Sequence, residues 1–352
     1  MARRRAMPAR RDGCGERRVA IAELGRDGRR NRGAGALPVT TAASFVPTGA
    51  CWVCGATGQR PVHTNCFELS VYAEQDPELT AYTGASVTLA KCPRCGFMQP
   101  EELPALPRFF DRLYDQRWSR AWVVAEFESR QKRAIFERLL RSLERRIPQR
   151  PRRLLDVGAH VGRFIAMARD RGWDAEGLEL NPTTAAYARE RTHAVIHQRP
   201  LRAVATDTRP FDAVTLTDVL EHMPRPVDVL RDAATALRSG GWVAVKVPCG
   251  RNQLMKERVR AALGRAARVS IADNLVHVTH FSPRALRCAL ERAGFDRVSI
   301  DVGVPERNET GSALGRAGSN IGRRMIYQVA RACPWGVHTP LAFNLQAFAR
   351  RP

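Results

Sequence analysis

The stretch that decides the fold is Leu154-Leu-Asp-Val-Gly-Ala-His-Val-Gly-Arg-Phe164. Its first residues form a short apolar run up to Val157, which predicts a buried strand. Gly158 and Gly162 then predict a turn in which the backbone can approach a ligand closely. The segment 163–171 has a helical pattern, and its first N–H groups face that turn. Strand, glycine turn and helix in this order are typical of a βαβ unit.

The same alternation of short apolar runs and helical segments continues beyond this stretch. It predicts an α/β fold with a doubly wound, mostly parallel sheet of seven strands. We expect strands at 153–157, 174–179, 194–197, 211–217, 241–247, 295–302 and, antiparallel, at 344–350, with helices at 163–171, 182–191, 226–238 and 283–293.

The chemistry is expected at the carboxyl ends of the first, second and fourth strands, where such a sheet opens a crevice. Glu179 ends the second strand about 20 residues after the glycine turn, and its carboxylate can accept hydrogen bonds from both hydroxyls of a ribose. This pattern fits either a nicotinamide dinucleotide or S-adenosylmethionine.

Four further segments stand in a fixed order around this site: Phe211-Asp-Ala-Val-Thr-Leu-Thr-Asp-Val-Leu-Glu-His222, Leu237-Arg-Ser-Gly-Gly-Trp-Val-Ala-Val-Lys-Val-Pro248, His280-Phe-Ser-Pro-Arg-Ala-Leu286 and Ala293-Gly-Phe295. Together with Leu154–Phe164 they closely resemble the class I S-adenosylmethionine-dependent methyltransferases. The nearest branch resembles the small-molecule enzymes related to the ubiquinone O-methyltransferases. The resemblance covers residues 152–302 and extends toward residue 350.

The resemblance implies S-adenosylmethionine as cofactor, with its methionine end on the glycine turn, its ribose on Glu179 and its sulfonium side under the end of the fourth strand. The family usually has Gly where His160 stands, and His160 can adopt a positive φ at modest cost. The implied cofactor-binding residues are Asp156, Gly158, His160, Gly162, Glu179, Thr217 and Asp218.

Two cysteine pairs, Cys51-Trp-Val-Cys54-Gly55 and Cys92-Pro-Arg-Cys95-Gly96, lie before the sheet. In each pair two thiolates can face one ion across a tight turn, and the Gly permits a left-handed backbone. The two pairs predict a closed four-cysteine zinc site with a structural role. Such a module before a methyltransferase domain is similar to enzymes that methylate sugars and other secondary metabolites.

The chain divides into a disordered basic arm (1–48), the zinc-binding module (49–100), an aromatic segment with a bridging helix (101–150) and the methyltransferase domain (151–350). Residues 1–33 contain eleven Arg and four acids. The rest of the formal net charge of +22 comes from Arg spread along the chain. Such a spread can reflect genome composition and does not by itself indicate a nucleic-acid partner. Without a signal peptide or an apolar run of about 18 residues, we expect a soluble, cytoplasmic protein with no membrane partner.

A small-molecule methyl acceptor is the expected partner, and a hydroxyl acceptor needs a base. Histidine suits this role near neutral pH, and the candidates are His280, His222 and His277. Glu221 beside His222 could orient an imidazole or help to hold a divalent cation. The insert 251–270 has six basic residues and one acid, so it either favours an anionic or nucleotide-linked acceptor or forms a solvated surface helix.

Two other functions fit parts of the sequence. A zinc module before a class I domain is also similar to some RNA methyltransferases, although no Asn-Pro-Pro-Tyr type motif follows the fourth strand. The second alternative is a binding protein that retains the methyltransferase fold but does not catalyse a reaction. The one feature that suggests it is His160, at a position where the family usually has Gly. The sequence does not indicate the oligomeric state.

Overall fold

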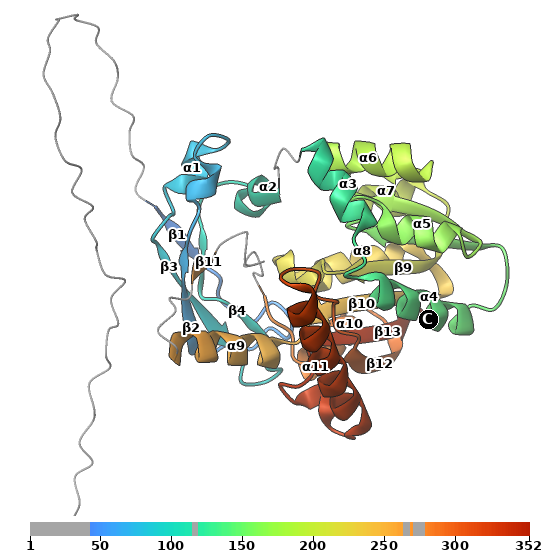
Figure 1. Cartoon of the computed structure of the whole chain (residues 1–352). Coiled ribbons are helices and arrows are strands. Elements are labelled where there is room, and N and C mark those ends of the chain that lie inside the picture. Colours follow the sequence, from blue (N-terminus) through green and yellow to red (C-terminus); the bar gives the residue numbers. More distant parts are fainter. Residues whose placement is uncertain (1–42, 115–118, 263–267, 270–278) are drawn as a thin grey trace, which may run out of the picture.

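The computed structural model of the chain describes residues 43–114, 119–262, 268–269 and 279–352. The expected disordered arm falls outside these ranges up to residue 42. Figure 1 shows a smaller N-terminal module beside a larger α/β domain. Phe45–Pro47 already forms a strand of the smaller module, β1, so this module begins before residue 49.

The larger domain contains a seven-stranded sheet of strand order β12-β13-β10-β9-β6-β7-β8. The strands from β10 to β8 are parallel, whereas β13 is antiparallel to both of its neighbours. The predicted doubly wound, mostly parallel sheet is therefore confirmed. The strands are β6 (Arg152–Val157), β7 (Trp173–Leu178), β8 (Ile196–His197), β9 (Phe211–Thr217), β10 (Leu237–Pro248), β12 (Asp296–Gly303) and β13 (Asn344–Arg350).

The central strands are apolar on both faces because helices cover both. Along β6, Leu154 packs with one group of helices and Leu155 with the other, as the two-residue period of a strand requires. The first group consists of α4 (Arg133–Arg146), α5 (Arg163–Arg169) and α6 (Pro182–Thr192). The second consists of α7 (Leu201–Asp207), α8 (Pro226–Ala236) and α10 (Pro283–Arg292).

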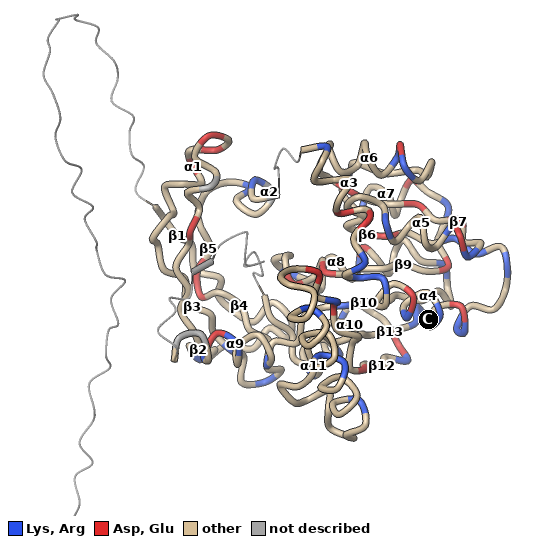
Figure 2. The backbone as a smooth tube through the Cα atoms, in the orientation of Figure 1, with Lys and Arg blue, Asp and Glu red and all other residues tan. Residues whose placement is uncertain are grey.

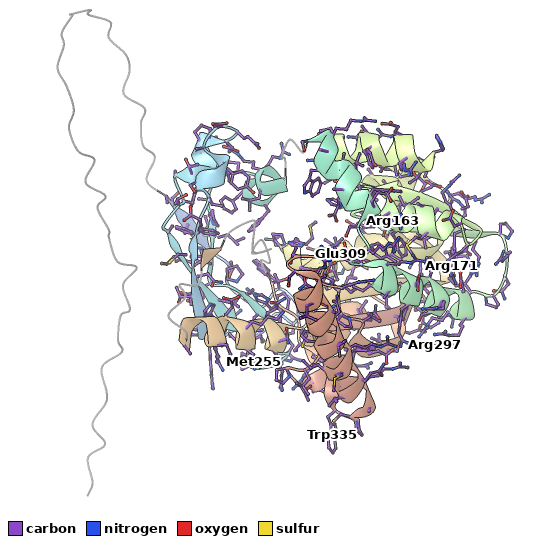
Figure 3. All side chains as sticks on the ribbon, viewed as in Figure 1. Arg163, Arg171, Met255, Arg297, Glu309 and Trp335 are labelled. Carbon is purple, nitrogen blue, oxygen red and sulfur yellow. The ribbon has the colours of Figure 1, made fainter. Side chains whose placement is uncertain are left out.

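The expected bridging helix is two helices, α3 (Arg120–Glu128) and α4. The chain breaks at Ser129, whose hydroxyl and the next backbone N–H both donate to Glu309, a residue labelled in Figure 3. Helix α4 does not bridge the modules, because its apolar face lies in the core of the α/β domain.

The N-terminal module is built on strands β2, β3 and β4, which pair antiparallel, with the β1–β5 pair beside them. An aromatic cluster that includes Tyr72, Tyr82 and Phe109 forms its own core. The elements are β2 (Arg60–Phe67), η1 (Ser70–Tyr72), α1 (Pro77–Thr80), β3 (Ser86–Lys91), β4 (Met98–Pro100), β5 (Glu102–Pro104) and α2 (Phe109–Tyr114).

The basic insert runs from the α/β domain to the N-terminal module (Figure 1). It forms α9 (Gly250–Ala262) and then β11 (Arg268–Val269), which pairs in parallel with β2. Two of its basic side chains have structural partners, since Arg251 donates to the His338 carbonyl and Lys256 lies over the Phe343 ring. The insert therefore joins the two parts of the molecule.

The last long helix, α11 (Ala313–Ala332), leads through η4 (Gly336–His338) to β13. Trp335 follows it and is 73% exposed, at the lower end of the helix in Figure 3. Figure 2 shows Lys and Arg on many elements of both parts. Within the described ranges, we find no helix with the length and hydropathy needed to cross a membrane.

Candidate functional site

The turn after β6 needs its first glycine. Gly158 has φ +73°, and a Cβ there would lie 2.7 Å from Cγ2 of Val219. Gly162, with φ +80°, is the N-cap of α5, and a Cβ there would lie 3.0 Å from side-chain atoms of α6. A larger residue at Gly158 would therefore collide with the loop that follows β9, so the turn and this loop lie in contact at the carboxyl edge of the sheet.

Glu179 follows β7 directly and is fixed by two backbone N–H groups. His160 donates to one carboxylate oxygen and Asn181 to the other, each at 2.8 Å. Burial raises the pKa of Glu179. Because each oxygen has a second lone pair, this carboxylate can still accept hydroxyl donors, as a ribose would require.

Asp156 near the end of β6 is 4% exposed and accepts a 2.6 Å hydrogen bond from the Thr215 hydroxyl. Burial raises its pKa to about 7. Thr217 ends β9 nearby in the sheet, and its hydroxyl oxygen is buried with no hydrogen-bond partner among the described residues. A buried carboxyl and an unsatisfied hydroxyl at one sheet edge fit a polar ligand.

His160 adopts the positive φ that its position needs, +51°. Its ring lies edge to face with the Trp122 ring of α3, with centroids 5.4 Å apart. Burial, together with the positive charge of Lys132, lowers the pKa of His160 to about 4. The ring is therefore neutral at pH 7.

Asp218 belongs to a charged cluster that sequence reasoning missed. Its carboxylate pairs with Lys246 of β10 and, at 2.8 Å, with Lys132 at the start of α4. Lys246, only 1% exposed, also contacts Glu306 at 3.0 Å. Burial opposes ionisation of Asp218, but the two ammonium groups hold its pKa well below the usual range. One signal was present in the sequence, since Lys246 interrupts an apolar strand in a chain with few lysines.

The candidate bases occupy two adjoining segments. His222 ends the short helix η2 (Leu220–His222), and Thr279 donates its backbone N–H to the Glu221 carbonyl at 3.0 Å. His280 follows Thr279, and burial, then the charge of His63, lowers its pKa to about 4. His277 lies outside the described residues. The structure thus places the segments of His222 and His280 side by side.

Glu221 is 2% exposed, and burial, reinforced by Asp218, raises its pKa well above the usual value. Within the described part of the chain, one group of three or more potential metal-ligating side chains lies close enough together to hold an ion, and Glu221 and His222 are not in it.

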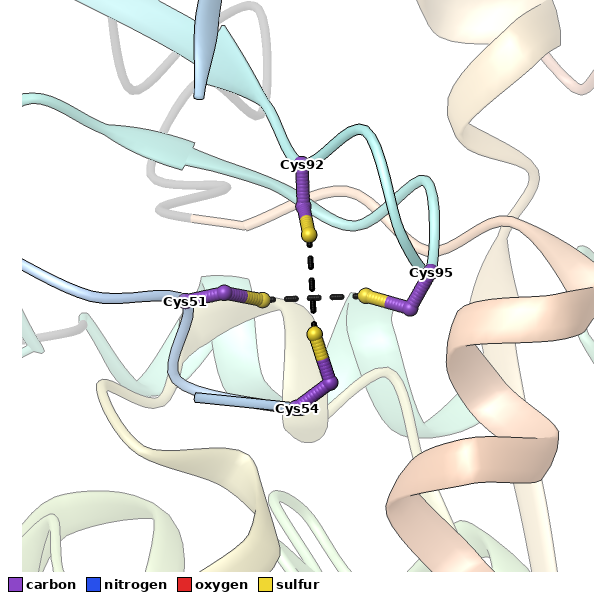
Figure 4. Close-up of side chains that lie close together, drawn as sticks. All are labelled: Cys51, Cys54, Cys92 and Cys95. Atoms are coloured by element: carbon purple, nitrogen blue, oxygen red, sulfur yellow. Dashed lines mark hydrogen bonds between the residues drawn. The ribbon is translucent and has the colours of Figure 1, made fainter. Parts of the chain in front are cut away.

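That group consists of the four cysteines of the two pairs (Figure 4). Their sulfurs all lie within 4.8 Å of one another, with Cys51 and Cys95 at 3.6 Å and Cys54 and Cys92 at 3.5 Å. Zinc–sulfur bonds of about 2.3 Å in a tetrahedron place sulfurs about 3.8 Å apart, so the spacing fits zinc.

The two cysteine turns have the same backbone pattern. Gly55 donates to the Cys51 carbonyl at 2.8 Å and Gly96 to the Cys92 carbonyl at 3.0 Å. Both glycines have positive φ, +72° and +74°. This repetition explains how two separate turns present their thiols to one point.

Comparison with known proteins agrees with this architecture. Residues 127–300 match the family described as Methyltransferase domain. The Burkholderia multivorans Ubiquinone biosynthesis O-methyltransferase is 30% identical over 156 residues, which cover 42% of this chain and 63% of that protein. The Nitrosomonas europaea protein of the same name is 31% identical over 96 residues, covering 26% and 41%. The chain thus spans less than two thirds of these relatives.

Among solved structures, a SAM-dependent methyltransferase from Archaeoglobus fulgidus aligns with a TM-score of 0.43 and 16% identity. The alignment covers 66% of this chain and 100% of that protein.

Proposed function

We propose that this chain, whose residues 127–300 form a methyltransferase domain of class I fold, transfers a methyl group from S-adenosylmethionine to a small molecule. The observation that carries the proposal is the hydrogen bond between the His160 N–H and Glu179, which joins the glycine turn to a carboxylate suited to a ribose. The buried Asp156 carboxyl near the same turn suits the ammonium group of the cofactor's methionine part.

The bound cofactor would supply a methyl group on a sulfonium, which is an excellent leaving group. The acceptor's lone pair forms the new bond to the methyl carbon while the carbon–sulfur bond breaks and its electrons stay on sulfur. The protein therefore has to align the acceptor at about 3 to 3.5 Å and take up its proton. His222, His280 and His277 stay the candidates for that proton.

The acceptor class we propose is an anionic or nucleotide-linked sugar or secondary metabolite, methylated on oxygen or carbon. The position of the basic helix α9 supports this class. Gly250 at its start donates a hydrogen bond to the Phe281 carbonyl, so α9 begins beside the segment of His280. Arg258 on α9 is exposed and can attract anions, whereas Arg251 has a structural partner.

We further propose that the four cysteines bind a structural zinc ion. Four sulfurs leave no open position for water, so the ion would stabilise the N-terminal module and take no part in the chemistry. Cys51 and burial raise the pKa of Cys95, and a cation at the centre of the four sulfurs would remove this obstacle to four thiolates.

The test begins with calorimetric titration of S-adenosylhomocysteine into the full chain. Glu179→Ala should weaken binding at least tenfold, whereas Asp174→Ala, which removes an exposed carboxylate on the preceding strand β7, should not. Transfer of labelled methyl groups is then followed to a metabolite extract and, separately, to structured RNA. Equal affinity for all variants would remove the assignment of Glu179, and transfer to RNA alone would replace the small-molecule proposal.

A further inference from the structure

His160 lies in the glycine turn and contacts both Glu179 and helix α3. Its backbone N–H donates to Glu179, its φ is left-handed, and its ring lies against the first turns of α3. The rings of His160 and Trp122 meet at 79°, the edge-to-face arrangement that aromatic pairs prefer. His160 Nδ1 also lies 3.9 Å from Oε1 of Glu126, one turn further along α3.

Helix α3 packs against the glycine turn and α6 through one buried face. Val123 and Phe127 lie in one cluster with Val161, and the Phe127 ring lies 5.9 Å from the Tyr187 ring. The N-terminal turn is tied to α6 by the Arg120–Glu190 ion pair. This pair is 72% and 60% exposed, so it contributes little stability. The Trp122–His160 contact adds a second tie between this end of α3 and the glycine turn, beside the cluster in which Val123 packs with Val161.

His160 makes this contact from a left-handed backbone conformation, which is strained for a residue with a side chain. Glycine would occupy the same φ without strain. A strained residue persists only where the surrounding structure holds it, and such residues cluster at functional sites. The strain therefore points to a task for the ring.

We propose that His160 is a positioning residue: its ring fastens α3 over the turn that holds the cofactor and slows release of the cofactor. The inference rests on the proposed function. Because the ring is neutral at pH 7, the contact is between two aromatic rings and not an ion pair with Glu126. Replacing the histidine by glycine should relax the backbone and still loosen the site.

The direct test measures the dissociation rate of S-adenosylhomocysteine by stopped flow. His160→Gly and Trp122→Ala should each speed dissociation about three- to tenfold, the range expected for an aromatic pair. The double variant should be no faster than either single variant. His160→Asn, which tolerates a left-handed backbone but has no ring, should behave like His160→Gly.

Two controls separate this role from a general loss of structure. Arg120→Ala removes the exposed ion pair from the same turn and should leave the rate unchanged, whereas Trp122→Phe keeps a ring and should retain part of the effect. Hydrogen exchange of residues 120–127 in the cofactor-free protein should be faster in His160→Gly and His160→Asn than in the wild-type protein and in Arg120→Ala.

The outcomes are distinct. If wild-type protein does not bind S-adenosylhomocysteine, the proposed function fails before the variants are compared. If it binds and His160→Gly releases it at the wild-type rate, or if the effects of His160→Gly and Trp122→Ala multiply, the positioning role is wrong.

Discussion

Met98 and His280 exchange two backbone hydrogen bonds, of 3.0 and 2.9 Å, across the boundary between the N-terminal module and the α/β domain. The Phe97 and Phe281 rings pack beside this bridge with centroids 5.0 Å apart, and both side chains are fully buried. The Ser282 hydroxyl donates to the Cys95 carbonyl at 3.1 Å. The cysteine cluster therefore supports the segment that holds a candidate base.

Removing the metal should loosen both sides of this boundary. A chelator should speed hydrogen exchange in residues 92–98 and also in 280–286, because the second cysteine turn contacts the segment of His280. Metal analysis should find about one zinc ion per chain. Cys333→Ser, an exposed cysteine outside the cluster, should retain the metal, whereas Cys95→Ser should lose it. Purified protein without zinc would contradict this prediction.

Asp218→Asn should be strongly destabilising, because it leaves Lys246 buried without its main counter-charge. We expect a loss of about 3 kcal/mol in the free energy of unfolding, measured with urea. Adding Lys246→Met to this variant should restore part of the loss, since the two residues act as one pair. Asp228→Asn breaks an exposed ion pair with Arg231 and should cost well under about 1 kcal/mol. Equal losses for the two Asp variants would show that the buried cluster contributes no more than a surface pair.

Cofactor affinity should depend on pH through Asp156. In the cofactor-free protein burial raises the pKa of this carboxyl from 3.8 to about 7, so below pH 7 it carries a proton. A cofactor ammonium group favours the carboxylate, so affinity should fall about tenfold per pH unit below 7 and level off above it. The same shift means that Asp156 makes the cofactor-free protein less stable as pH rises from about 4 to 7.

Calorimetry between pH 5.5 and 8.5 measures this dependence, and repeating it in buffers of different ionisation enthalpy shows the proton released on binding. Asp156→Asn should bind more weakly at pH 8 and lose most of the slope. An unchanged slope in this variant would assign the titration to another group.

Replacing the base should slow methyl transfer without weakening cofactor binding. His222→Ala, His280→Ala and His277→Ala are compared, and loss of a general base should lower kcat about 10²- to 10⁴-fold. The backbone bridge of His280 to Met98 survives its replacement, so its variant tests the ring alone. Three fully active variants would exclude a histidine base.

Sequence periodicity was sufficient for the sheet and for the turn after β6. The apolar run that includes Leu154 and Leu155 predicts a buried strand, and the glycines at 158 and 162 predict the turn. Both are local signals that tertiary contacts reinforce. The charged cluster was not readable in this way, because Lys132 reaches Asp218 from a break between two helices whose sequence resembles one continuous helix. The break depends on Glu309, a distant residue, and no local pattern encodes such a contact.

The parallel pairing of β11 with β2 has a consequence for how the chain folds during synthesis. The N-terminal module leaves the ribosome early, but Cys66 and Phe67 at the end of β2 gain their partners on this edge only when Arg268 and Val269 have emerged. Until then β2 presents open backbone groups that another chain could pair with. Pauses in translation before residue 270 should therefore lengthen the time in which this end of β2 can pair with another chain.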